Sequence, residues 1–248
     1  MIERHPVVFL RGLWLHANSW GRWVELFAAH GYAAVAPGWP GDELTVRATR
    51  GRSGALPGLG ISEIREHYAR IAGGFTARPV LIGHGLGGLL ALTLAAETHA
   101  AGVIAIDAGP VSAMPPTRKP LPGPGAATLS RDEFRVVYGS ALSRGESDRL
   151  YERWAIPAPQ GALRETVRLD TLVSRPGAHT TNSSRGPVLL MASGKSRRWR
   201  AAQYVAEACL LIGADVVVFH DRGPSLVIDR GWRLVAESCL SWMDAQEL

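Results

Sequence analysis

Short apolar segments alternate with amphipathic segments along most of the chain. Six apolar segments are rich in Val and Ile and predict strands, at Val7–Leu10, Ala33–Ala36, Val80–Ile82, Val103–Ile106, Val188–Met191 and Val216–Phe219. Helical periodicity fills most of the intervals between them, over Trp20–His30, Ile61–Ala72, Leu86–Thr98, Arg198–Ile212 and Gly231–Ala245. Strands that are apolar on both faces are typical of a parallel sheet with helices on both sides. The pattern therefore predicts one doubly wound α/β domain over residues 1–248, with a mostly parallel sheet of about six strands.

The interval between Ala108 and Pro187 departs from this alternation, because it contains no convincing strand. It begins rich in proline and glycine, which predicts an irregular connection. Ser130 and Ser143 are each followed three positions later by a glutamate, and this Ser-x-x-Glu pattern predicts two capped helix starts. The interval follows the carboxyl end of a strand, where α/β sheets bind ligands. We therefore expect residues 110–186, approximately, to form a helical lid over the site.

Composition narrows the class of protein. Apolar residues make up 46% and charged residues 20% of the 248 positions, which excludes a largely disordered chain. The net charge is +5, but the basic residues are scattered, so no nucleic-acid partner is expected. No segment has the length of uncharged apolar sequence that a membrane span needs, and the N-terminal region lacks the features of a signal peptide. We expect a cytoplasmic protein, and the sequence leaves a homodimer open.

The histidines and the two cysteines show no metal-ligand spacing. We therefore expect neither a metal site nor a cofactor.

The segment from Val80 to Leu89 has the pattern of a strand, a tight turn and a helix. In α/β-hydrolases this is the nucleophile elbow, Gly-x-Ser-x-Gly. Its outer glycines are needed where strand and helix pass close together, and its central residue is strained so that the side chain enters the site. Here Gly83 and Gly87 are present, but Gly85 occupies the position of the nucleophile.

The chain resembles the bacterial α/β-hydrolase superfamily over essentially its whole length, particularly the small lidded hydrolases of actinobacteria. Besides the elbow, the resemblance is carried by Gly12–Ala17, Ala36–Asp42, Ala105–Asp107, Tyr151–Pro157, Asp221–Gly223 and Asp229–Arg233. It implies an α/β-hydrolase fold with helices on both faces of the sheet and a helical lid insertion.

The resemblance also implies where a catalytic triad should lie, and the chain departs from it at all three positions. The nucleophile position is Gly85, the acid position is Ser196 and the histidine position is Pro224. Hydrolysis through an acyl-enzyme needs a nucleophile, a base and a group that orients the base. None of these three residues can perform its part, so we do not expect triad hydrolysis.

Several groups could still perform chemistry in such a pocket. Backbone N–H groups that could polarise a carbonyl belong to Leu86 and to Leu13 or Trp14. Side chains expected to line the pocket are those of His16, Trp154 and Ser225. The candidate catalytic residues are Arg11, His84 and Asp107. Each also has a structural interpretation: a salt bridge for Arg11, a scaffold role for His84 and a turn cap for Asp107.

Three functions compete at this point. The first is a cofactor-free cyclase, isomerase or lyase acting on an apolar small molecule in bacterial specialised metabolism. The second is an inactive pseudo-hydrolase that binds a small molecule or assists another enzyme. The third is residual hydrolysis through Ser196 or Ser225, for which no base is obviously placed. Fold alone does not choose between the first two.

Overall fold

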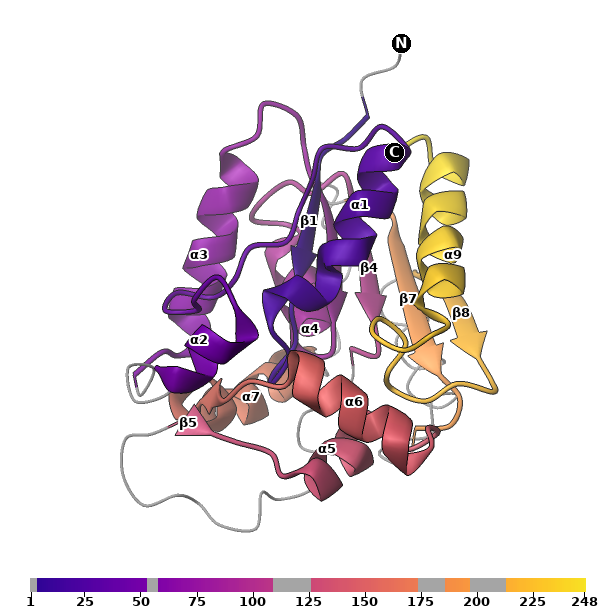
Figure 1. Ribbon diagram of the computed structural model, residues 1–248. Coiled ribbons are helices and arrows are strands. Elements are labelled where there is room, and N and C mark those ends of the chain that lie inside the picture. The colour runs from indigo at the N-terminus through magenta and orange to yellow at the C-terminus, as the bar shows by residue number, and fades with distance from the viewer. Residues whose placement is uncertain (1–3, 53–57, 109–125, 174–185, 197–212) are drawn as a thin grey trace.

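A six-stranded parallel sheet forms the centre of the computed structural model, which describes residues 4–52, 58–108, 126–173, 186–196 and 213–248 (Figure 1). The strand order is β2-β1-β3-β4-β7-β8, and every neighbouring pair is parallel. In that order the strands are Ala34–Val35, Val7–Leu10, Val80–His84, Gly102–Ile106, Val188–Ser193 and Asp215–Phe219. All six predicted strands are therefore found. The predicted α/β class, with a mostly parallel sheet of about six strands, is confirmed.

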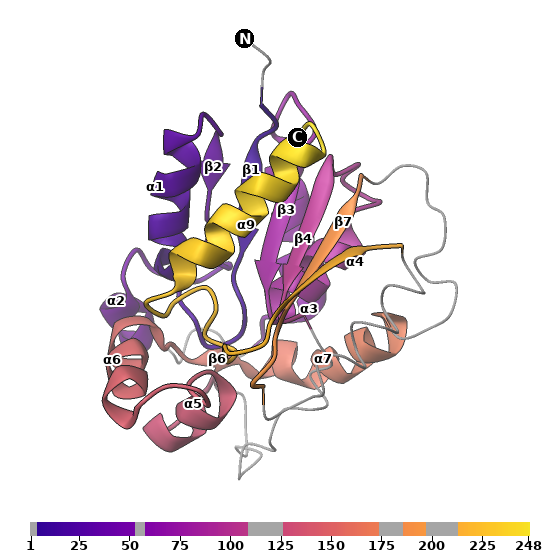
Figure 2. The same ribbon diagram turned by 90° about the vertical axis from the view of Figure 1, so that its right-hand side faces the viewer.

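Helices cover both faces of the sheet (Figures 1 and 2). Helices α1 (Gly21–Ala29) and α9 (Trp232–Ala245) lie on one face, and α3 (Ile61–Gly73) and α4 (Leu86–Leu94) lie on the other. Every residue of β1, β3 and β4 is buried, because helices cover both faces of these strands.

Three helix predictions need comment. The helix predicted over Trp20–His30 is divided into a 3-10 turn, η1 (Ala17–Trp20), and α1. The helix predicted to reach Thr98 ends at Leu94. The predicted helix Arg198–Ile212 lies outside the described residues. The short helix α2 (Val46–Gly51) was not predicted, because six residues are too few to establish a periodic pattern.

The described part of the interval between β4 and β7, residues 126–173, is called here the insertion. It contains α5 (Arg131–Val137), α6 (Arg144–Trp154) and α7 (Gln160–Val173). The predicted capping boxes at Ser130 and Ser143 are both present. Figure 1 shows these helices gathered beyond the carboxyl ends of the strands, where the lid was expected.

The prediction that this interval holds no strand was wrong. Two-residue strands β5 (Ala126–Ala127) and β6 (Ala158–Pro159) pair antiparallel across the insertion. Two residues are too short to show an alternating pattern, so their pairing is a property of the tertiary structure. Helix α7 was likewise not predicted.

Candidate active site

The turn between β3 and α4 keeps the elbow geometry. Gly85 has φ 57° and ψ −120°, and its N–H donates to the carbonyl oxygen of Ile106 at 2.9 Å. A Cβ on Gly83 would lie 2.1 Å from the carbonyl oxygen of Gly87. A Cβ on Gly87 would lie 2.1 Å from the carbonyl oxygen of Leu10. Strand and helix therefore pass so closely that only glycine fits on either side of the turn.

The central position of the elbow is open. A Cβ on Gly85 would meet no atom of the described structure within 4 Å. Space therefore does not exclude serine there; the conformation does add strain for any residue with a side chain, about 1–3 kcal/mol. The elbow thus keeps its shape and supplies room where a nucleophile would project.

Backbone strain gathers at the carboxyl edge of the sheet. Trp14 (φ 59°) follows β1, Gly85 (φ 57°) follows β3, and Asp107 (φ 47°) follows β4. A bulky residue with positive φ persists only where surrounding contacts enforce it, and such residues cluster at functional sites. Two strained residues and one glycine with positive φ, on three adjacent strand ends, mark this edge as the candidate active site.

The oxyanion loop, residues 11–16, is held by the insertion. The indole Nε1 of Trp14 donates to the carbonyl oxygen of Ala127 at 3.0 Å, and the N–H of Ile156 donates to the carbonyl oxygen of Trp14 at 2.9 Å. The N–H of His16 donates to the carbonyl oxygen of Trp154 at 3.0 Å. These contacts fix the strained conformation of Trp14, and with it the direction of the backbone N–H groups in this loop.

Tyr138 was not among the predicted site residues. Its hydroxyl donates to the carbonyl oxygen of Leu13, and its ring packs against that of His84 with centroids 5.9 Å apart. Phe134 and Tyr138 are one helical turn apart, and this spacing indicates a buried face but not what covers it. Besides the N–H of Leu13 or Trp14, the sequence predicts that the backbone N–H of Leu86 could polarise a carbonyl, and Leu86 is the first residue of α4.

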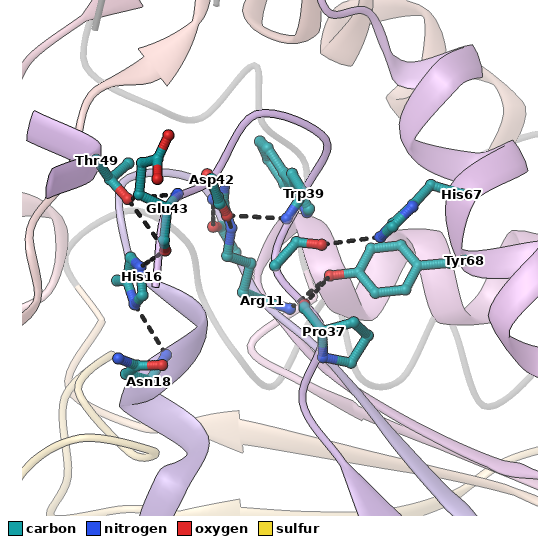
Figure 3. A network of polar contacts seen from close by, with 12 residues as sticks. Arg11, His16, Asn18, Pro37, Trp39, Asp42, Glu43, Thr49, His67 and Tyr68 are labelled. Carbon is teal, nitrogen blue, oxygen red and sulfur yellow. Dashed lines mark hydrogen bonds and ion pairs between the residues drawn. The ribbon is translucent and has the colours of Figure 1, made fainter. Parts of the chain in front are cut away.

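Arg11 is engaged by an acidic partner. Its Nε and Nη2 donate to the two carboxylate oxygens of Asp42 at 2.7 and 2.9 Å (Figure 3). Its guanidinium also lies 3.6 Å from the ring centroid of Trp39, and the side chain is 1% exposed. A bidentate, stacked arginine is held in one geometry. The structure therefore matches the structural interpretation of Arg11, a salt bridge.

The same network anchors the segment that follows β2 (Figure 3). The carboxylate of Asp42 accepts from the N–H of Trp39 at 2.8 Å, and the hydroxyl of Tyr68 donates to the carbonyl oxygen of Pro37 at 3.3 Å. Burial raises the pKa of Tyr68 to about 12, so the phenol stays protonated and remains a donor. The network thus joins this segment and α3 to the start of the oxyanion loop.

His16 is buried within this loop as a neutral imidazole. Its Nδ1 accepts from the N–H of Asn18 at 3.1 Å, and its Nε2 donates to the carbonyl oxygen of Glu43 at 2.9 Å. Both ring nitrogens are therefore used by the tautomer that carries its proton on Nε2. Desolvation by burial lowers the pKa of His16. His16 positions the loop through these contacts.

This burial predicts an acid-dependent loss of stability. Since the folded state has the lower pKa, the unfolded chain binds more protons below its ordinary value of 6.5, and folding weakens as the pH falls through that value. We expect the free energy of unfolding of His16→Gln to depend less on pH between 7 and 5 than that of the wild type. Urea unfolding at several pH values measures this, with His220→Gln as the exposed control. Parallel pH profiles for wild type and His16→Gln would contradict the prediction.

His84 and Asp107 lie on neighbouring strand ends. Nε2 of His84 donates to the carbonyl oxygen of Pro224 at 3.1 Å, which joins the elbow strand to the position expected for the catalytic histidine. Oδ1 of Asp107 accepts from the N–H of Ser193 at 2.7 Å, which joins the ends of β4 and β7. Both residues are buried at the candidate site, and both make structural contacts there.

The expected histidine position is filled by a buried polar cluster. Pro224 is buried, and the hydroxyl of Ser225 donates to Oδ2 of Asp229 at 2.7 Å. Asp229 also pairs with Arg222 and accepts from the N–H of Gly231 at 2.8 Å. Ser225 is therefore a structural donor in this cluster. The expected acid position, Ser196, is half-buried beyond β7.

Two structural features bear on cofactor and membrane binding. Within the described residues, no three His, Cys, Asp or Glu side chains gather as a metal site would require. No helix in that part of the chain has the length and apolar character needed to cross a membrane.

Comparison with known proteins decides the family. The model of the alpha/beta hydrolase family matches residues 7–238, nearly the whole chain. The chain belongs to the α/β hydrolase family. No match is found among curated proteins.

Solved structures of α/β hydrolase relatives share the fold at low identity. A methylesterase, MES16 from Arabidopsis, is 14% identical with a TM-score of 0.66, and the match covers 96% of this chain and 98% of that one. Tomato methylketone synthase I in complex with 2-tridecanone is 10% identical with a TM-score of 0.70, covering 99% and 100%. A monoacylglycerol lipase from Paleococcus ferrophilus is 17% identical with a TM-score of 0.70, covering 98% and 95%. At these identities the likeness concerns the fold.

Proposed function

We propose that this α/β hydrolase family protein is a cofactor-free, non-hydrolytic enzyme that cyclises, isomerises or cleaves an apolar small molecule by a lyase reaction. The observation that carries the proposal is the elbow, which keeps its turn conformation and open central position around Gly85, a residue without a nucleophile. The positive φ angles of Trp14 and Asp107 at the same edge of the sheet are strained, because both residues carry side chains, and strain retained there favours continued use of the site.

The proposed chemistry rests on the backbone and on one or two side chains. Backbone N–H groups of Leu86 and of Leu13 or Trp14 would stabilise an enolate formed from a carbonyl substrate. His84 or Asp107 would hold or move a proton at the strand ends. Such a reaction transfers a proton or closes a ring within the substrate, and it needs no covalent nucleophile.

Arg11 takes a different part in this proposal. Because its guanidinium is occupied by Asp42, we assign it a positioning role: it holds the oxyanion loop in place. The insertion would act as the lid, since its contacts with Trp14 and His16 link its position to the geometry of that loop. A cytoplasmic location and the use of the enzyme in bacterial specialised metabolism are parts of the same proposal.

The test adds the purified protein to a metabolite extract of a strain that lacks its gene, followed by chromatography with mass spectrometry. A compound consumed catalytically, with a product of equal mass, supports an isomerase or cyclase, and a lighter product supports a lyase. A product heavier by one water overturns the proposal. Stoichiometric retention of one compound without turnover supports the second candidate, a binding protein. 2-Tridecanone, the compound bound by the tomato neighbour, is a defined probe of retention.

Restoring serine at the elbow should not restore hydrolysis. We expect Gly85→Ser to show no esterase activity on p-nitrophenyl butyrate above the uncatalysed rate, because Pro224 supplies no base and triad residues act as a unit. The triple variant Gly85→Ser/Ser196→Asp/Pro224→His is the matched comparison. Saturable hydrolysis by the single variant would show that another residue already serves as base.

A further inference from the structure

A surface cleft of about 250 Å³ lies away from the elbow, between α6, the start of α1 and the turn that leads into α9. In Figure 1, α6 lies below α1 and close to the yellow turn before α9. Four arginines line the cleft from these three elements, together with two tryptophans: Arg22, Arg149, Arg153, Arg230, Trp154 and Trp232.

The cleft holds more positive charge than its own carboxylates neutralise. Its two carboxylates belong to Asp229, which is buried and paired with Arg222, and Glu146, which accepts hydrogen bonds from Ser143 and lies 3.4 Å from Arg230. The other three arginines, Arg22, Arg149 and Arg153, are exposed and belong to none of the ion pairs found within the described residues, although the charge of Arg149 also acts on Glu146.

The positions of two arginines on α6 add to this excess of positive charge. Arg149 and Arg153 are four positions apart, so they share one face of the helix and repel each other. An anion between them would relieve that repulsion. Because Arg22 reaches the same cleft from α1, an anion there would receive donors from more than one side. A phosphate monoester carries a charge of about −1.5 to −2 and three terminal oxygens, so it compensates more than one arginine, whereas a carboxylate carries a single charge.

The two indoles define the rest of the ligand. The guanidinium of Arg153 lies 4.7 Å from the ring centroid of Trp154, and Trp232 packs against Trp23 with centroids 6.2 Å apart. Trp154 and Trp232 are both half-buried, so each exposes part of a flat apolar surface at the cleft. A volume of about 250 Å³ admits a small head group and one ring.

We propose that this cleft binds a small molecule in which a phosphate monoester is attached to a single aromatic ring. The phosphate lies among Arg22, Arg149 and Arg153, and the ring lies against the indoles. A bound ligand joins α6 of the insertion to α1 of the core. The side chain of Trp154, which the sequence predicted in the elbow pocket, lines this cleft instead, while its carbonyl oxygen holds His16. The reaction proposed at the elbow uses no side chain of this cleft, so the site stands or fails separately from the proposed function.

The experiment is calorimetric titration of the full chain with phenyl phosphate at constant ionic strength, compared with inorganic phosphate and benzoate. We expect phenyl phosphate to bind more tightly than either. The variant Arg149→Gln/Arg153→Gln should lose affinity by about tenfold or more, because charge-assisted hydrogen bonds are lost. Arg144→Gln is the matched control, since Arg144 lies on the same helix, is 70% exposed and pairs with Asp132 outside the cleft.

Each other outcome overturns the proposal. Absence of saturable binding removes the site, and equal affinity for benzoate replaces a phosphate site by a carboxylate site. Equal affinity for inorganic phosphate removes the aromatic part of the ligand. An equal loss in the double variant and in Arg144→Gln shows only nonspecific attraction of an anion to a basic protein. Before the titrations are compared, a cooperative urea unfolding transition like that of the wild type confirms that both variants are folded.

Discussion

Arg11→Met is expected to lower the free energy of unfolding by about 3–5 kcal/mol, because it leaves the carboxylate of Asp42 buried without its cation. The side chains of Arg11 and Asp42 are 1% and 3% exposed, so water cannot replace the lost partner. Methionine keeps most of the side-chain volume of arginine, which separates the loss of charge pairing from the loss of packing. Urea unfolding followed by circular dichroism measures the change.

Two further variants test whether the loss of stability comes from the unpaired buried charge. Arg65→Met removes an exposed pair, in which Arg65 and Glu97 are 38% and 51% exposed, and should cost less than about 1 kcal/mol. In Arg11→Met/Asp42→Leu both charges are gone, and much of the stability should return because no unpaired charge remains. If Arg11→Met cost no more than Arg65→Met, the buried pair would not be what holds the oxyanion loop.

Gly87→Ala is expected to abolish the folded state or to lower its stability by more than about 4 kcal/mol. The added Cβ would lie 2.1 Å from the carbonyl oxygen of Leu10 and 2.7 Å from that of Arg11. Both atoms belong to the backbone at the end of β1, so no side-chain rotation relieves the clash. Soluble yield, circular dichroism and urea unfolding would report the loss.

Gly85→Ala is the matched control two residues away. Its Cβ would meet nothing within 4 Å, so only the positive φ of 57° opposes it, at about 1–3 kcal/mol. We therefore expect Gly85→Ala to fold with reduced stability while Gly87→Ala does not. Equal behaviour of the two variants would mean that backbone conformation, and not the close approach of β1 to α4, controls the elbow.

The strands of the sheet could be predicted from the sequence because the apolar pattern that indicates each strand lies within a few consecutive residues. Continuous apolar segments such as Val80–Ile82 indicate a strand buried on both faces wherever it lies in the sheet. Ser130 and Ser143 could be predicted as helix starts for the same reason, since each capping partner is three residues away. The elbow was recognised from Gly83 and Gly87, whose spacing reflects a backbone contact that only glycine permits.

The contacts that arrange the candidate site depend on residues far apart in the chain. Arg11 could be noted as an unusual charge, but nothing in the sequence assigns it to Asp42, 31 positions away. Tyr138 and Leu13 are separated by 125 positions, and their hydrogen bond exists only because the insertion returns to the oxyanion loop. Sequence patterns indicate that such side chains are buried, whereas their partners are fixed by tertiary packing.

The interval that contains the insertion leaves the sheet at Ile106, the carboxyl end of β4, and returns at Val188, the amino end of the neighbouring strand β7, where Val188 lies opposite Val103. Because the two strands are parallel, the connection is a crossover, and the rigid sheet fixes the positions of both its ends whatever lies between them. Loop-closure entropy grows only with the logarithm of length, so doubling this segment would cost about 0.6 kcal/mol. Segments of different length and origin could be grafted between β4 and β7 with little effect on the sheet. A graft would need to replace the backbone contacts to Trp14 and His16, which makes these contacts the design constraint for exchanging this part of the protein.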